Sequence, residues 1–203
     1  MRNITEASAT AGAASTLLIP EPSLVLLVGA AGSGKSSFAK KHFRPTEVLS
    51  SDFCRSLVYD DEGDQAATAD AFAVLRFIAA RRLRAGRLTV IDATNVKRAA
   101  RDRSLVLARR FQLPAVAIVL DLPELVCMQQ NRERERRVPQ MIIQEQLQEL
   151  RKGLPDLAGE GFASVYVLRS RVEIEHAILE RVPTLPSITP PATTPRGNSE
   201  LPL

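Results

Sequence analysis

The sequence has little of several residue types that would indicate particular classes of protein. Its 203 residues include no tryptophan, two cysteines and two histidines, and aromatic residues make up 4%. Two cysteines cannot form a disulfide framework, so we expect a reduced, cytoplasmic protein. So few histidines and cysteines argue against a structural zinc site. The scarcity of aromatic residues leaves few platforms for base stacking.

Long apolar runs are missing too. None reaches the about 20 residues that a membrane helix needs, and residues 1–20, rich in Ala, Ser and Thr, lack the apolar stretch of a secretory signal. We therefore expect residues 1–22 to be a disordered leader and no membrane association. Residues 183–203 carry six prolines and predict a flexible, disordered tail. The folded domain is expected over residues 23–182.

Between these ends, the hydrophobic pattern alternates between strands and helices. Short apolar runs predict strands at 24–28, 47–49, 88–91, 115–120 and 165–168. Helical patterns occupy residues 37–42, 66–85, 96–111, 123–132, 141–154 and 172–181. This alternation predicts an α/β fold, with a parallel sheet of about five strands flanked by helices on both faces.

The most specific motif lies between the first strand and the first helix. Residues 29–36 read GAAGSGKS and match G-x4-G-K-[ST], the phosphate-binding loop. Its backbone N–H groups cradle phosphates, Lys35 reaches the β and γ phosphates, and Ser36 Oγ binds Mg²⁺. We therefore expect ATP, or GTP, together with Mg²⁺. The predicted nucleotide-binding residues are Gly29, Gly32, Ser33, Gly34, Lys35, Ser36, Ser37 and Arg132.

Polar residues follow the next two strands. Asp52 lies where ligands collect in a parallel sheet and could accept a proton from an acceptor hydroxyl. It could equally cap the helix that follows. Arg55, three residues on, suits phosphate capture but could be a surface residue. Asp92 is the candidate for holding Mg²⁺ through water. Thr94 and Asn95, which follow it, could cap the next helix.

Two arginine-rich segments stand out. Residues 131–139 form a candidate helical lid whose arginines (Arg132, Arg134, Arg136 and Arg137) could neutralise a transferring phosphoryl group. The alternative is a solvated helix face. Residues 76–110 carry a net charge of +9 (eleven basic residues and two aspartates) in a chain of net charge +4. This asymmetry suits a polyanionic acceptor, although exposed helix faces also collect arginine.

Together these residues resemble the kinase module of the bacterial polynucleotide kinase-phosphatase. The matching stretches cover roughly residues 24–168 and are GAAGSGKSSFAKKHF, TEVLSSDFCR, DDEGDQAAT, GRLTVIDATNV, PAVAIVLDLPE, VCMQQNRERERR and EGFASVYVL. The resemblance implies a P-loop kinase that uses ATP and Mg²⁺ to phosphorylate a 5′-hydroxyl end of RNA or DNA in nucleic-acid repair. No metallophosphatase His/Asp cluster is visible, so phosphatase or ligase activity would come from separate partner proteins.

The resemblance also implies roles for individual residues. Asp52 corresponds to the general base, and Lys35, Arg134 and Arg137 complete the catalytic set. Arg55 and Gln65 correspond to acceptor-binding residues, and we assign Thr94 to the same side. Where the family has a further lid arginine, this sequence has Gln130, and Arg132 is the candidate substitute.

Two other functions share many of these features. A small-molecule kinase acting on a sugar, nucleotide or antibiotic would also combine a phosphate loop, an early aspartate and a lid. A module in which ATP binding switches a partner would need the loop but no acceptor base.

Overall fold

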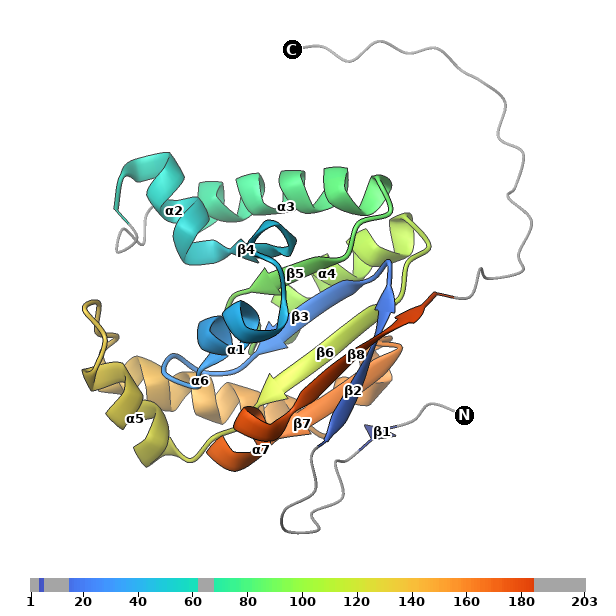
Figure 1. Cartoon of the computed structure of the whole chain (residues 1–203). Helices are drawn as coiled ribbons and strands as arrows, with labels where there is room; N and C mark the ends of the chain where they lie inside the picture. The colour runs from blue at the N-terminus through green and yellow to red at the C-terminus, as the bar shows by residue number, and fades with distance from the viewer. Residues whose placement is uncertain (1–3, 6–14, 62–67, 185–203) are drawn as a thin grey trace, which may run out of the picture.

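The computed structural model describes residues 4–5, 15–61 and 68–184, and its centre is a parallel sheet (Figure 1). The strand order is β1-β7-β6-β3-β5-β4. The strands are β1 (Ile4–Thr5), β3 (Leu24–Val28), β4 (Val48–Ser50), β5 (Thr89–Asp92), β6 (Ala115–Leu120) and β7 (Ser164–Leu168). The expected parallel sheet is confirmed, with the two-residue β1 added beside β7.

Helices cover both faces of this sheet, as the alternating pattern predicted (Figure 1). They are α1 (Lys35–His42), α2 (Ser51–Tyr59), α3 (Thr68–Arg84), α4 (Arg98–Arg110), α5 (Glu124–Arg132), α6 (Gln140–Gly153) and α7 (Arg171–His176). The sequence of the central strand β3 shows why helices pack on both faces, because successive side chains of a strand point to opposite faces of the sheet. Leu24 and Leu26 pack with α3, α4 and α6, whereas Val25 and Leu27 pack with α1.

The ends of the fold differ from the sequence-based prediction. Residues 16–21, expected in a disordered leader, form β2 (Thr16–Glu21), and Leu17 and Ile19 are fully buried. β2 pairs in parallel with β8 (Ile178–Pro183), so the helix predicted over 172–181 is α7 followed by a strand. β2 has only two buried apolar residues, Leu17 and Ile19, in alternate positions. These are enough to form a strand because β8, distant in the sequence, pairs with it. Ile4–Thr5, also in the predicted leader, form β1, and Pro183, the first residue of the predicted tail, ends β8. Residues 1–3, 6–14 and 185–203 lie outside the described residues.

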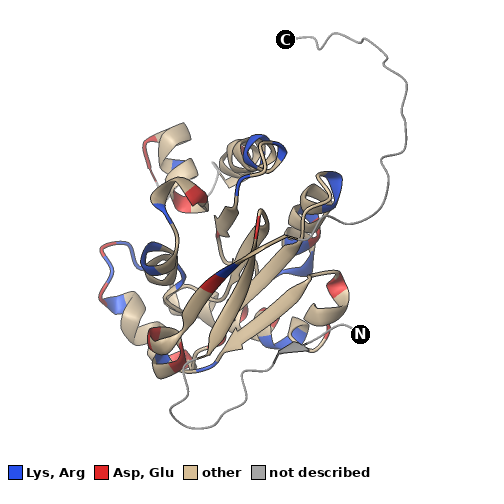
Figure 2. Ribbon diagram, turned by 45° about the vertical axis from the view of Figure 1, so that its right-hand side comes forward, with Lys and Arg blue, Asp and Glu red and all other residues tan. Residues whose placement is uncertain are grey.

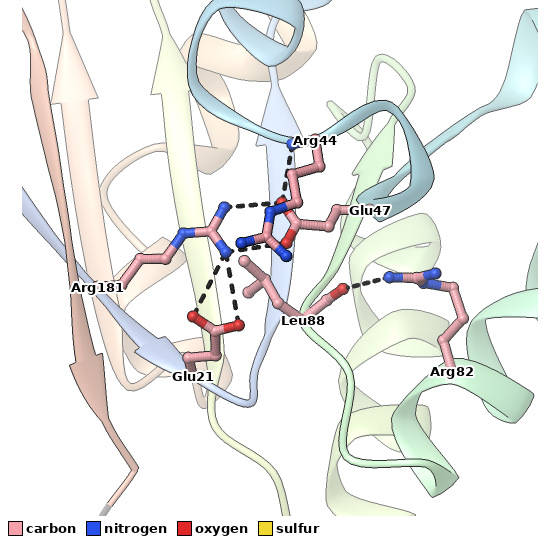
Figure 3. A network of polar contacts seen from close by, with 6 residues as sticks. All are labelled: Glu21, Arg44, Glu47, Arg82, Leu88 and Arg181. Carbon is pink, nitrogen blue, oxygen red and sulfur yellow. Dashed lines mark hydrogen bonds and ion pairs between the residues drawn. The ribbon is translucent and has the colours of Figure 1, made fainter.

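An ion-pair network fastens this strand pair to the segment between α1 and β4 (Figure 3). Arg181 of β8 donates through two guanidinium nitrogens to the buried Glu47 carboxylate, at 2.9 and 2.8 Å. The backbone N–H of Arg44 donates to Glu47 Oε2 at 2.9 Å, and Arg181 also contacts Glu21 of β2. Burial alone would raise the pKa of the Glu47 carboxyl, but these hydrogen bonds and the charges of Arg181 and Arg44 lower it below its usual value.

The basic stretch over residues 76–110 is dispersed by the fold rather than gathered at one site. Arginines lie on both α3 and α4, which are separate helices of the fold (Figure 2). Both helices connect parallel strands, so each runs back from the carboxyl edge of the sheet to the amino edge. Arg84 and Arg110, at their C-terminal ends, therefore lie away from the phosphate loop. Arg101 is buried in a bidentate pair with Glu160, with N···O distances of 2.7 and 2.6 Å.

Candidate active site

The phosphate loop adopts a conformation that requires its glycines. Gly32 has φ 77°, and a Cβ atom there would come within 2.1 Å of the Cys127 carbonyl oxygen. Gly34, with φ 88°, is the N-cap of α1. Such positive φ values favour glycine because it has no Cβ. The turn from β3 into α1 thus presents backbone N–H groups and a helix N-terminus, which together favour anions.

Lys35 lies buried at the centre of this loop. Its Nζ donates to the carbonyl oxygens of Gly29 and Ala30, at 2.8 and 2.7 Å. Burial lowers the pKa of Lys35 to about 8, an effect opposed by the negative charge of Asp92 and reinforced by Arg134. The ammonium therefore lies within electrostatic reach of the predicted metal-side carboxylate and a predicted lid arginine.

A cavity of about 610 Å³ lies beside the loop, at the carboxyl edge of the sheet, and is called the central cavity here. It brings together predicted site residues from four different segments. These are Lys35, Ser36, Asp52, Arg55, Asp92, Thr94, Arg134 and Arg137. Gln65, predicted for the same side, lies outside the described residues.

Asp52 projects into this cavity from the first turn of α2. The N-cap of that helix is Ser50, whose side chain accepts from the Phe53 N–H, so Asp52 is not the cap. Its Oδ1 pairs with Arg55 Nη1 at 2.7 Å and with Arg136 Nη1 at 3.5 Å. Arg55 is buried, which rules out the surface interpretation. Asp52 itself is about half exposed and is therefore open to an acceptor.

Asp92 ends β5 and is buried in the wall of the same cavity. Its carboxylate and the Ser36 hydroxyl are the oxygen ligands that Mg²⁺ prefers, since this ion is usually held by one or two carboxylates together with substrate phosphates. The described residues contain no cluster of three or more His, Cys, Asp or Glu. The residues thus fit a metal held mainly by a nucleotide, with Ser36 and Asp92 as the protein's contribution.

Asn95 does not have the capping role expected of it. The N-cap of α4 is Lys97, whereas Asn95 has φ 50° and donates through Nδ2 to the carbonyl oxygens of Leu27 and Ala93, at 2.8 and 3.3 Å. The side chain of Asn95 therefore ties the segment after β5 to the strand that leads into the phosphate loop. Thr94 lines the central cavity as predicted.

The lid that was predicted to be helical over residues 131–139 is instead the last two residues of α5 followed by a loop, residues 133–139, which leads into α6. Asn131 anchors it: its Nδ2 donates to Val138 O at 2.8 Å and its Oδ1 accepts from the Val138 N–H at 3.0 Å. Arg134, Arg136 and Arg137 line the central cavity. Arg132, predicted to bind nucleotide, is exposed and lines neither this cavity nor the next one described.

A second cavity, of about 440 Å³, lies on the other side of the phosphate loop. Ser33, Gly34 and Ser37 line it, as does Gln130, which the sequence comparison placed at the missing lid arginine. Arg134 lines both cavities, so its guanidinium stands between them.

One residue of the site was not predicted, and another was predicted without its contact. Arg136 was one of four equivalent lid arginines, and its contact with Asp52 distinguishes it. Gln146 accepts from the Ala31 N–H of the phosphate loop at 2.8 Å and lines the central cavity. The sequence around Gln146 contains no motif that could have singled it out.

The chain is similar to known proteins in sequence and in fold. Residues 24–156, well over half of the chain, match the model of a family described as AAA domain. The chain belongs to this family. None of the curated proteins shows a significant match. No helix among the described residues is both long enough and apolar enough to cross a membrane.

Solved structures share the fold at low sequence identity. The chain is similar to one in the Pnkp1/Rnl/Hen1 RNA repair complex, with TM-score 0.59 and 20% identity, covering 68% of this chain and 47% of that one. A chain of the AvrRxo1-ORF1:-ORF2 complex gives TM-score 0.57 and 15% identity, with coverage of 74% and 55%. The chain thus spans about half the length of these two.

A sugar kinase from Janibacter sp. gives TM-score 0.51 and 24% identity, covering 76% of this chain and 91% of that one. These likenesses establish a kinase-like P-loop fold, which is a nucleotide-binding fold. They include neighbours from both polynucleotide and small-molecule systems, so they do not choose the acceptor.

Proposed function

We propose that this protein is an ATP-dependent polynucleotide kinase that transfers the γ-phosphate to a 5′-hydroxyl end of RNA or DNA. The observation that carries the proposal is the composition of the central cavity. One accessible carboxylate, Asp52, lies among cationic side chains beside the phosphate loop. Among the described residues that line this cavity, the cations are Lys35, Arg55, Arg134, Arg136 and Arg137, and the carboxylates are those of Asp52 and Asp92. This excess of positive charge suits an acceptor that carries phosphate next to its hydroxyl.

The residues would divide the reaction among them as follows. Asp52 accepts the proton of the acceptor hydroxyl, whose oxygen attacks the γ-phosphorus in line with the leaving oxygen. Arg55 and Arg136, both on Asp52 Oδ1, hold the carboxylate in place. Lys35, Arg134 and Arg137 neutralise the charge that spreads over the moving phosphoryl group. Ser36 and, through water, Asp92 would hold Mg²⁺, which would supply further positive charge to the phosphates of the nucleotide.

The donor nucleoside is assigned to the second cavity. Ser33, Gly34 and Ser37 form its wall on the loop side, so phosphates in the loop leave the nucleoside directed there. Arg134, between the two cavities, can then contact the γ-phosphate from the lid. The 5′-phosphate end so produced is one that a ligation reaction consumes, which agrees with separate ligase or phosphatase partners.

Transfer of label from γ-labelled ATP to 5′-hydroxyl oligonucleotides tests the function, using RNA and DNA in single-stranded and duplex forms. Lys35→Ala and Asp52→Asn are each expected to reduce transfer more than 100-fold. Asp52→Asn should still bind ATP, because Asp52 lies on the acceptor side. Glu180→Gln, an exposed residue of β8, is the matched control. No transfer to any oligonucleotide overturns the proposal: transfer to a sugar or nucleotide instead identifies a small-molecule kinase, and ATP binding without transfer identifies a switch module.

A further inference from the structure

A third cavity, of about 740 Å³, lies between α3, the start of α4 and α6, and is called the side cleft here. It shares four lining residues with the central cavity, namely Phe72, Thr94, Ile142 and Gln146. The two spaces are therefore neighbours with a common wall. An acceptor whose hydroxyl is beside Asp52 can extend from the central cavity into the side cleft.

The charges of the two spaces are opposite. Among the described residues that line the side cleft there is no arginine, and the charged side chains are Glu145, Glu149 and Lys97. Gln146 and Gln148 add side-chain amides. The two carboxylates would repel a phosphate group. They would instead accept hydrogen bonds from the N–H groups of an uncharged ligand. The side cleft is therefore suited to a part of the acceptor that carries no phosphate.

The remaining wall of the side cleft is apolar. Phe72 of α3 and Ile142 of α6 contribute large side chains, and Val96 and Ala100 contribute smaller ones. Ile142 is 39% exposed, so apolar surface stays open to a ligand. Apolar and aromatic walls with a few hydrogen-bonding groups are the usual lining of a pocket for a planar organic group.

The wall of the side cleft that residues 94–96 form is fixed by hydrogen bonds. Arg101 donates through Nη1 to the carbonyl oxygens of Asn95 and Val96, at 3.0 and 2.6 Å, and its other nitrogens bind the buried Glu160. The Asn95 side chain in turn holds β3. The segment 94–96 is thereby fixed relative to the phosphate loop, so a ligand meets a preformed surface.

We propose that the side cleft binds the base of the acceptor's 5′-terminal nucleoside. This inference rests on the proposed kinase function and names the part of the acceptor that the arginines do not bind. The base lies against Phe72 and Ile142, and its amino groups donate to Glu145 and Glu149. Bases with an exocyclic amine, which are adenine, cytosine and guanine, then bind better than uracil, which has none.

The test compares oligonucleotides that differ only in the 5′-terminal unit. One series carries adenine, cytosine, guanine or uracil there, and one member carries an abasic sugar with the same 5′-hydroxyl. We expect kcat/KM to fall about tenfold for the abasic end, and to be lower for uracil than for cytosine. Equal kcat/KM for all ends, the abasic one included, overturns the inference but leaves the kinase function intact. Absence of transfer to every member is instead a failure of the kinase function.

Variants locate the effect in the side cleft. Glu149→Gln should reduce the preference for cytosine over uracil without changing kcat/KM for the abasic end, and Glu180→Gln should change neither. Glu149→Lys is expected to weaken the preference in the same way. If Glu149→Lys instead raises kcat/KM equally for normal and abasic ends, the side cleft carries phosphates and the inference is wrong.

Discussion

Two guanidinium groups of different origin meet at one carboxylate oxygen of Asp52. Arg55 is buried on α2, three residues from Asp52 on the same helix. Arg136 comes from the loop 133–139 and its side chain is 35% exposed. The first contact is fixed by helix geometry, whereas the second exists only when the loop lies over the cavity. Arg136 therefore connects the position of the loop to the acceptor-side carboxylate.

Replacing Arg136 should thus affect transfer beyond the loss of one charge. Arg136→Ala is expected to lower kcat about 10- to 100-fold, because Asp52 then lacks one of the two cations that hold its carboxylate in place. Arg136→Lys should recover only part of the loss, since an ammonium lacks the planar fork. Steady-state kinetics with saturating ATP measure the effect. Arg103→Ala, on the exposed face of α4, serves as the control, and a kcat for Arg136→Ala equal to that of the control would contradict the role.

The sequence was enough to predict which individual residues line the central cavity where those residues come soon after a strand. Lys35, Asp52 and Asp92 line the central cavity because parallel strands end at a common edge. Arg132 lies outside both cavities and Gln146 was not predicted at all. The positions of these two residues depend on the path of the loop and on packing between distant helices. Nothing local distinguishes Arg132, which is outside both cavities, from Arg136, which contacts Asp52.

Among the elements, the loop 133–139 is closed at its base by one side chain. Asn131 donates to and accepts from the backbone of Val138. These two hydrogen bonds join the two ends of the loop across seven residues. This arrangement leaves Arg134, Arg136 and Arg137 to project from a loop whose two ends are held together. The asparagine thus limits how far the loop can move from the central cavity.

Removing this anchor should loosen the loop without disturbing the sheet. Asn131→Ala is expected to accelerate tryptic cleavage between residues 132 and 137 several-fold, because open loops are cut more readily. Limited proteolysis with mass spectrometry measures the rate. Gln129→Ala, on the exposed side of α5, is the matched control. Unchanged cleavage in Asn131→Ala would show that other contacts hold the loop.

A second element-scale prediction concerns the strand pair β2 and β8. Because the pKa of Glu47 is lowered in the folded protein, its ion pair with Arg181 stabilises the fold at pH values above the ordinary 4.5 and is lost as the pH falls through the lowered folded value. Glu47→Gln should therefore reduce the free energy of unfolding by about 1–3 kcal/mol at pH 7.

Urea unfolding at pH 7 and at pH 3 measures this difference. Wild type and Glu47→Gln should approach one another toward the lower pH, because the stabilisation from Glu47 is lost as the pH falls through its lowered pKa in the folded protein. A difference that stays constant over this range would mean that the ion pair contributes no pH-dependent stability. Glu180→Gln, next to Arg181 in β8, controls for the loss of a surface charge.

The strand pair was also the part of the fold that the sequence did not predict. The inner strands of the main sheet are continuous apolar runs, which local pattern is enough to detect. β2 and β8 are half exposed and are stabilised by pairing with each other across the whole chain. A pattern confined to either segment carries no information about the other, so the leader and a last helix were predicted instead.

At the scale of the whole molecule, the net charge conceals an uneven distribution. The central cavity is cationic, the side cleft contains two carboxylates and one lysine, and many arginines of α3 and α4 lie toward the amino edge of the sheet. Charge at that edge is too far from the phosphate loop to contact a short acceptor. The distribution, rather than the total of +4, therefore determines which arginines bind acceptor phosphates.

Salt dependence separates these two groups of arginines. The double variant Arg84→Gln and Arg87→Gln should leave unchanged both the KM for a short oligonucleotide and its slope against salt concentration. Arg55→Gln, at the arginine predicted to bind the acceptor, should raise the KM and reduce the slope by about one, as expected for loss of one phosphate contact. Kinetics between 50 and 200 mM salt measure both quantities. An equal loss of slope in the double variant would place the acceptor along α3 instead.

The pairing of β2 with β8 has a consequence for how the protein is made. A ribosome completes residues 16–21 well before residues 178–183, the strand that pairs with them. At about 5–20 residues per second, β2 waits roughly 10–30 s for β8. During that time Leu17 and Ile19, which end fully buried, have no paired strand beside them. The phosphate loop of the nascent chain is therefore part of an unfinished fold until β8 has been made.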